Sequence, residues 1–149
     1  MFEIKNISKS FGRKKVLSSV SFNVEPGSCV GLLGINGSGK STLLNILAGC
    51  IKADSGSFGF TGSGKRISYL PQDNPLIPEL SAIDNIKLWQ SGGNKVLTSE
   101  YAVSILEKLG VNAFLHKKVK DMSGGMRKRL SLAITMMEAP DLLLLDEPL

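Results

Sequence analysis

The spacing of apolar and polar residues changes several times along the chain, and each pattern predicts a different element. Apolar residues alternate with polar ones over residues 2–7 and 16–24, which is typical of β-strands with one solvated face. We expect the first to be an edge-type strand, separated from the second by a polar loop over residues 8–15. Shorter strands are expected at residues 28–33, 57–60, 66–70 and 142–145. Residues 28–33 and 142–145 are nearly continuous apolar runs, which favours burial of these two strands in a parallel sheet.

Helical spacing fills much of the remaining sequence. A short apolar pattern over residues 43–48 predicts a helix that Gly49 ends. Residues 71–78 are predicted to be an exposed loop with apolar residues at its tip. Three further helices are expected, with these inner faces: Ile83, Ile86, Leu88 and Trp89 after Ser81, until Gly92–Gly93 breaks the pattern; Val103, Leu106 and Leu109 between Thr98 and Gly110; and Met126, Leu130, Ala133, Ile134 and Met137 between Gly125 and Pro140. Strands and helices in this order predict an α/β fold with a mostly parallel core sheet and antiparallel strands at its N-terminal end.

Composition narrows the class of protein. With 149 residues, 42% hydrophobic and 21% charged, the chain suits one soluble domain or part of one. Cys29 and Cys50 lack metal-site spacing, so we expect reduced, buried cysteines. The net charge of +5 comes from short basic clusters without interleaved aromatic residues, which favours solvated faces near a nucleotide or anionic headgroups over nucleic-acid binding.

A glycine-rich stretch contains the first candidate functional motif. Residues 34–41 fit the pattern G-x-x-x-x-G-K-[ST], in which glycines let backbone N–H groups converge on a polyphosphate. Lys40 would lie between the β- and γ-phosphates, and the Ser41 hydroxyl would bind Mg²⁺. The sequence therefore predicts a nucleoside-triphosphate site, with these residues around the nucleotide: Gly34, Ile35, Asn36, Gly37, Ser38, Gly39, Lys40, Ser41 and Thr42.

Two further features fit the same chemistry. Asp146 and Glu147 follow a run of four leucines, where a buried strand would deliver a carboxylate for a metal and a second one as a base for attacking water. Read alone, they are also compatible with a charged turn. Ser123-Gly124-Gly125 opens a helix, which predicts at least an N-cap and, if two chains face each other head to tail, a second anion site.

Taken together and in this order, the motifs resemble those of the ATP-binding subunits of ABC transporters, over all 149 residues. Residues 34–42 resemble the Walker A loop, residues 142–147 the Walker B strand and residues 123–125 the signature turn. The resemblance implies that Phe11 stacks on adenine beside Val16, and that Gln72 contacts Mg²⁺ and the attacking water. The implied catalytic residues are Glu147, Lys40 and Gln72, and the implied metal ligands are Ser41, Gln72 and Asp146.

The resemblance also implies a fold, ligands, partners and a cellular location. The fold would be that of a P-loop NTPase with a helical signature subdomain, using ATP and Mg²⁺. Partners would be a second ATP-binding subunit in a head-to-tail dimer and a separate membrane-spanning permease contacted by the loop from Gln72 to Leu80. The chain would lie in the cytoplasm on the inner face of the membrane, and no nucleic-acid partner is expected.

The sequence departs from the family in two places. Met122 and Met126 replace the leucine and glutamine that flank the signature turn, which predicts a weaker contact to the nucleotide of a partner chain. The sequence also stops at Leu149, before the family's later strand and its histidine, for which His116 lies too early. We therefore expect a partial domain lacking the C-terminal part of the fold, with a catalytic core at residues 1–75 and 138–149 and a helical subdomain at about 76–137. Such a chain alone would be marginally stable, would bind ATP weakly and would hydrolyse little.

Two other functions stay open at this point. One is a soluble ABC-type ATPase acting on nucleic acid or the ribosome, although the stretch between Gln72 and Ser123 lacks the heptads of a long coiled coil. The other is a non-hydrolysing remnant that only binds nucleotide or a partner. The residues specify neither the cargo nor a homo- or heterodimer. The short segment between Gly56 and Gln72 is more typical of exporters than of importers.

Overall fold

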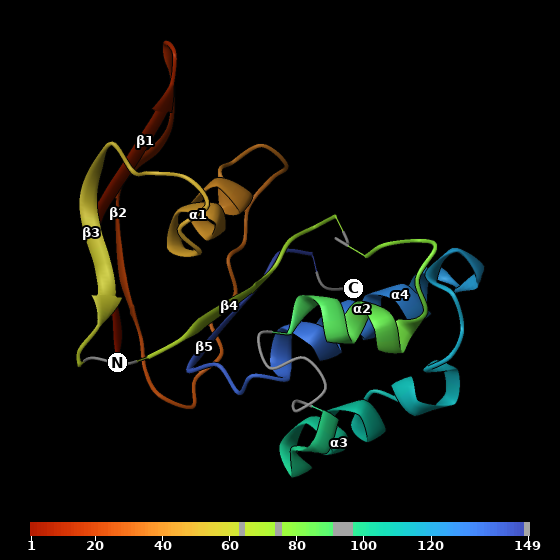
Figure 1. The fold of residues 1–149 in the computed structure, drawn as a ribbon. Helices are drawn as coiled ribbons and strands as arrows, with labels where there is room; N and C mark the ends of the chain where they lie inside the picture. Colours follow the sequence, from red (N-terminus) through yellow and green to blue (C-terminus); the bar gives the residue numbers. More distant parts are fainter. Residues whose placement is uncertain (63–64, 74–75, 91–96, 148–149) are drawn as a thin grey trace. The chain divides into compact units, whose positions relative to one another are not determined.

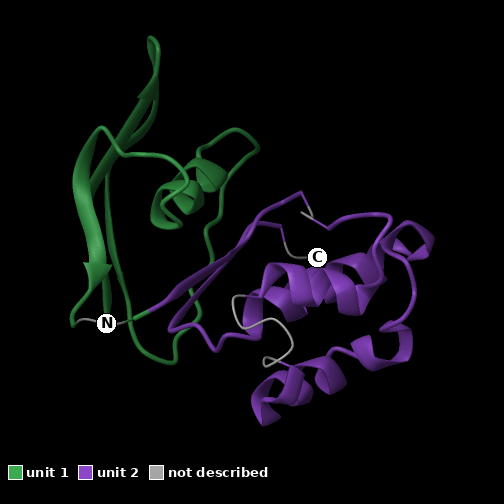
Figure 2. Ribbon diagram, in the orientation of Figure 1, with its two compact units in different colours: residues 1–65 green, residues 66–149 purple. Residues whose placement is uncertain are grey.

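The computed structural model describes residues 1–62, 65–73, 76–90 and 97–147 in two compact units, Met1–Lys65 and Arg66–Leu149 (Figure 2). The first unit holds an antiparallel sheet and one helix. The second holds a parallel pair of strands and a group of helices (Figure 1). None of the described helices has the length and apolar character that a membrane span needs.

The sheet of the first unit has the order β2-β1-β3, with β1 at Phe2–Phe11, β2 at Lys14–Val24 and β3 at Ser55–Phe60. The prediction of an edge strand near the N-terminus is wrong, because β1 is the central strand. Alternation reports only that one face is solvated, and in an antiparallel sheet this holds for central strands too. The predicted polar loop over residues 8–15 is also wrong, since only Gly12 and Arg13 separate β1 from β2. The alternation predicted for β2 is interrupted, because Leu17 is buried while Ser18 is exposed.

A bulge in β1 places its backbone directly against a glycine of β3. The register between the two strands shifts between Lys5 and Ser8, and Asn6 has a φ of 53°. Gly56 lies opposite with a φ of +93°, and a Cβ built on it would come within 2.5 Å of the carbonyl oxygens of Lys5 and Asn6. Glycine is therefore required at this position by both its backbone conformation and its surroundings.

The helix α1 spans Lys40–Leu47 and confirms the predicted helix, although it begins three residues earlier. Gly49, with a φ of 77°, follows its end. The strand predicted at residues 28–33 is wrong: this stretch is not a strand, and Leu33 is 95% exposed. An apolar run forms a strand only where neighbouring backbone pairs with it, and no described strand does so here. Cys29 and Cys50 are free as expected, but both are exposed, so their predicted burial is wrong.

In the second unit, β4 (Ile67–Leu70) pairs in parallel with β5 (Leu142–Leu145), from Ile67 opposite Leu142 to Leu70 opposite Leu145. The amides of Asp141 and Leu142 both donate to the carbonyl of Arg66 and so fix the start of this register. The parallel character predicted from the leucine run is confirmed. Of the four leucines, Leu144 is buried and the others are half-buried.

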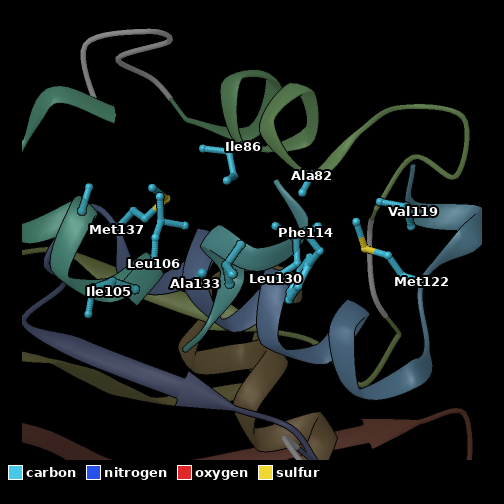
Figure 3. Close-up of a cluster of buried hydrophobic side chains, with 12 residues drawn as sticks. Ala82, Ile86, Ile105, Leu106, Phe114, Val119, Met122, Leu130, Ala133 and Met137 are labelled. Atoms are coloured by element: carbon cyan, nitrogen blue, oxygen red, sulfur yellow. The ribbon is translucent and has the colours of Figure 1, made fainter. Parts of the chain in front are cut away.

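The helices of this unit are α2 (Ala82–Trp89), α3 (Glu100–Lys108) and α4 (Gly124–Met136), with short 3₁₀ turns η2 (Val111–Phe114) and η3 (Val119–Asp121). Figure 3 shows their shared core, in which Ile86 of α2, Leu106 of α3 and Leu130 of α4 point toward one another. The inner face predicted for α4 is confirmed at Leu130, Ala133 and Met137.

The inner faces predicted for α2 and α3 are each partly wrong. In α2 the buried residues are Ala82, Asn85 and Ile86, whereas Leu88 and Trp89 are about half exposed. In α3 they are Ala102, Ile105 and Leu106, and Val103 is 39% exposed. Ala82 and Ala102 take inner positions in the shared core, and the larger apolar residues beside them are turned outward. The predicted break at Gly92–Gly93 lies outside the described residues.

The loop before α2 also differs from its prediction. Leu76 packs against the helical core and Ile77 is half-buried, so the apolar residues do not form an exposed tip. The buried side chain of Asn85 holds the loop, because it accepts a hydrogen bond from the Ile77 amide at 2.8 Å and donates to the Ile77 carbonyl at 3.1 Å. Contact of the loop from Gln72 to Leu80 with a membrane partner stays a prediction. Residues 74–75 lie outside the described part of the loop.

We predict that Gly56→Ala lowers the free energy of unfolding of the natural protein by about 2–4 kcal/mol, because the new Cβ meets two backbone carbonyls at a left-handed φ. Urea denaturation followed by circular dichroism measures this change. Gly59→Ala in the same strand is the matched control, since a Cβ there meets nothing within 4 Å, and we expect a change below about 1 kcal/mol. Equal effects of the two substitutions would contradict the described β1–β3 pairing.

Candidate functional site

The glycine-rich loop lies in the first unit and folds back onto its own lysine. The Lys40 Nζ donates hydrogen bonds to the carbonyl oxygens of Gly34 at 2.8 Å and Ile35 at 3.1 Å. The Ser38 amide donates to the same Ile35 carbonyl at 3.2 Å. These bonds close residues 34–40 into a ring through the Lys40 side chain.

Three glycines make this closure possible. Gly37 and Gly39 have φ values of 78° and 101°, which residues with a Cβ adopt only with strain. A Cβ on Gly34 would lie 2.7 Å from the Ser38 hydroxyl. A Cβ on Gly39 would lie 3.1 Å from the Val16 side chain, so the structure brings Val16 of β2 beside the loop, while its contact with adenine stays a prediction.

The loop has the properties of an anion site. Asn36, Gly37 and Ser38 are exposed, and α1 begins directly after them, with its unpaired N–H groups and positive dipole end on the loop side. The fully described first turn of α1 contains no acidic residue. Ser41 and Thr42 lie in this turn and are half-buried. The arrangement suits a phosphate chain.

Phe11 lies at the tip of the β1–β2 hairpin in the same unit. Its ring is 52% exposed, and the Lys9 Nζ lies 5.4 Å from the ring centroid. An exposed ring on a hairpin can stack on a planar ligand, while an aromatic ring packed on the core would be covered. The structure shows the exposed ring, and stacking on adenine stays a prediction.

The second unit brings Gln72 and Glu147 together, although they are far apart in sequence. Leu70 and Leu145 are paired at the ends of β4 and β5, and each chain then continues in the same direction. Two residues further along, the Gln72 side chain donates from Nε2 to Glu147 Oε2 at 2.9 Å. The parallel register thus places the predicted water-contacting amide on the predicted base.

Asp146 is the buried member of the acidic pair. It is 5% exposed, its amide donates to the Leu70 carbonyl at 3.0 Å, and the Tyr69 hydroxyl lies 3.5 Å from its Oδ2. No three His, Cys, Asp or Glu side chains gather into a metal cage among the described residues. One carboxylate with a hydroxyl and an amide oxygen from elsewhere is nevertheless the sparse, oxygen-only set that Mg²⁺ accepts when phosphates complete its shell. Gln72 and Asp146, which lie in the same unit, are of the kinds that Mg²⁺ accepts, and metal binding by Ser41, Gln72 and Asp146 stays a prediction.

Glu147 has a second partner that the sequence did not suggest. Its φ of 48° lies in the left-handed region, and its backbone carbonyl accepts a hydrogen bond from the Lys128 Nζ of α4 at 3.1 Å. Lys128 is half-buried, unlike the exposed lysines around it in the sequence. Its position in a basic helix next to the signature turn was the only available signal.

The turn at residues 123–125 is confirmed as the N-cap of α4. The Ser123 hydroxyl accepts a hydrogen bond from the Met126 amide at 3.2 Å, while Gly124 and Gly125 are exposed and have open space around them. Met126 packs against the helical core, so this methionine fills apolar space in the unit. Binding of an anion at this turn stays a prediction.

The predicted site residues are thus distributed over both units. Phe11, Val16 and residues 34–42 lie in the first, and Gln72, residues 123–125, Asp146 and Glu147 lie in the second. Within the first unit the structure joins Val16 to the glycine loop. Within the second it joins Gln72 to Glu147.

Comparison with known proteins agrees with these motifs. The family described as ABC transporter matches residues 17–149. The linearmycin resistance ATP-binding protein LnrL of Bacillus subtilis is 32% identical over 99% of this chain and 51% of its own. The lantibiotic transport ATP-binding protein SrtF of Streptococcus pyogenes is 36% identical over 99% of this chain and 66% of its own. The chain therefore spans about half to two thirds of the length of these curated relatives.

Solved structures show the same fold. A dimeric cassette in a post-hydrolysis state, bound to ADP and Pi, superposes with a TM-score of 0.81 at 26% identity, over 99% of this chain and 74% of that one. A nucleotide-free ATP-binding cassette gives 0.80 at 27% identity, over 100% and 69%. The predicted P-loop fold and the predicted resemblance are both confirmed: the chain belongs to the ABC transporter family and has the fold of its ATP-binding cassettes.

Proposed function

We propose that this chain binds MgATP and, within the complete transporter, hydrolyses it to drive a separate membrane-spanning permease. The observation that carries the proposal is the hydrogen bond between Gln72 and Glu147, which sets an amide and a carboxylate at the end of two parallel strands. The closed glycine loop supplies the matching phosphate site. The family membership supports ATP as the ligand.

Each residue has a role that its surroundings support. The loop amides and Lys40 would neutralise the β- and γ-phosphates, in exchange for the carbonyls that Lys40 contacts here. Ser41, Gln72 and Asp146 would hold Mg²⁺, which supplies charge neutralisation on the phosphate oxygens. The proposed catalytic core comprises residues 1–75 and 138–149, and the proposed helical subdomain comprises about residues 76–137.

Glu147 would act as the base that orients and deprotonates the attacking water. Its Oε2 is held by the Gln72 amide, which leaves the second carboxylate oxygen to face the water. Gln72 would bind the same water through its amide oxygen. The two residues would therefore act as one unit on the water.

Further partners follow from the family. Phe11 and Val16 would cover the adenine, and the turn at residues 123–125 would contact the γ-phosphate held by a second subunit in a head-to-tail dimer. A dimeric cassette among the solved structures supports this arrangement. The names of SrtF and of the Nod factor export protein of Rhizobium etli support transport as the process. We propose a position on the cytoplasmic face of the membrane and no nucleic-acid partner.

We predict that Lys40→Ala weakens ATP binding to the natural protein by at least about tenfold, because a charged hydrogen-bond donor to the phosphates is lost. Fluorescence titration with a labelled ATP analogue measures the affinity. Lys15→Ala, an exposed lysine in β2 of the same unit, is the control and should leave the affinity unchanged. Unaltered affinity in Lys40→Ala would contradict the assignment of the loop.

We predict that Glu147→Gln lowers ATP turnover by about 100-fold or more while ATP affinity is retained, because the substitution removes the base and keeps the side-chain shape. Steady-state phosphate release and nucleotide titration give the two values. Glu107→Gln on the exposed side of α3 should change neither of them. Normal turnover in Glu147→Gln would show that another group activates the water.

A further inference from the structure

The helix α4, which begins at the signature turn, is hydrogen-bonded to Glu147 within the same unit. Lys128 lies just over one turn after the Ser123 cap of α4 and donates from Nζ to the Glu147 carbonyl at 3.1 Å. Glu147 is thus held at two points: its carboxylate by Gln72 from the loop after β4, and its main chain by Lys128 from α4.

The neighbouring basic residues are used differently. Arg127 donates from Nη1 to the Met122 carbonyl at 2.7 Å, which closes the turn before α4. Arg129 donates to the Leu109 carbonyl at 3.3 Å and lies 5.3 Å from the centroid of the Phe114 ring. Both arginines therefore fasten α4 to the helical part of the unit. The Lys128 side chain instead reaches the residue that follows the C-terminal end of β5 by two positions, Glu147.

The contact has a specific consequence because of the Glu147 backbone. A non-glycine residue at a φ of 48° needs neighbours that hold it in place, since an extended conformation is lower in energy. A hydrogen bond to its carbonyl oxygen restricts the main chain of Glu147, on which the position of its side chain depends. Without this bond, the carboxylate would keep the Gln72 contact in only part of the ensemble.

We propose that Lys128 is a positioning residue for Glu147, and that through it α4 links the signature turn at Ser123 to the carboxylate of the same chain. A displacement of the turn when it engages a ligand would move Lys128, because both lie on the first turns of one helix. The proposal rests on the proposed function of Glu147 as the base. It adds a link between the signature turn and Glu147 that stays within one subunit.

The test uses Lys128→Met in the natural protein, since methionine keeps most of the side-chain length and loses the donor. We expect kcat for ATP hydrolysis to fall about tenfold with KM and nucleotide affinity unchanged, because a misplaced base affects the chemical step alone. Lys128→Arg retains a donor and should recover kcat to within about threefold. Lys120→Met, an exposed lysine of η3, is the matched control and should match the natural protein.

A double substitution separates positioning from a general structural role. In a Glu147→Gln background, Lys128→Met should cause no further loss of the residual turnover, because Lys128 acts only through that carboxylate. Thermal unfolding of every variant shows whether it is folded, and Lys128→Arg tests the proposal even if Lys128→Met does not fold.

The outcomes are distinct. A normal kcat in Lys128→Met, a tenfold loss that persists in the Glu147→Gln background, or no recovery in Lys128→Arg would each overturn the role of Lys128 while leaving the proposed ATPase function in place. Normal turnover in Glu147→Gln alone would overturn both, because no base would then be present for Lys128 to position.

Discussion

The parallel pairing of β4 with β5 is the constraint on which the candidate catalytic residues depend. Gln72 and Glu147 lie on different segments and neither forms part of a strand. They meet because Leu70 is paired with Leu145 and both chains continue in the same direction. A shift of one residue in this register would turn one of the two side chains to the opposite face. The bonds from Asp141 and Leu142 to the Arg66 carbonyl guard against such a shift. A pairing of leucines thus determines which polar groups meet at the sheet edge.

Chemistry that is local in sequence could be predicted well. Gly37 and Gly39 are required by their positive φ values and Gly34 by its contact with Ser38, so the local motif identifies all three. The C-terminal end of α1 before Gly49 and the cap at Ser123 follow the same rule. The wrong predictions concern strands whose structure depends on residues that are distant in sequence. Alternation in β1 could not say that strands lie on both of its sides. The apolar stretch 28–33 could not form a strand without a neighbour.

The same distinction applies to the helices and to the site. Spacing predicted helices in the correct places, but Val103 and Trp89 turned outward because packing around Ala102 and Ala82 decides the rotation of each helix. The contact of Lys128 with Glu147 was not predicted, for a related reason. Its bond to Glu147 depends on where α4 lies against the strand pair, and no pattern within the helix encodes that position. Family resemblance supplied Gln72 and Glu147 as functional residues, and the structure adds the residue that holds Glu147 in place.

The most direct test of this account is cysteine cross-linking at the end of the β4–β5 pair. Cys29 and Cys50 are free and exposed, so both are first replaced with serine in the natural protein. The described register predicts that Leu70→Cys with Leu145→Cys forms a disulfide in most molecules under mild oxidation, because paired residues of neighbouring strands lie within the Cα separation that a disulfide spans. Leu70→Cys with Leu144→Cys should form little, since successive side chains of β5 point to opposite faces of the strand pair. Mass spectrometry of the non-reduced protein measures both. A cross-link in the second pair and none in the first would contradict the register and, with it, the proposed catalytic pair.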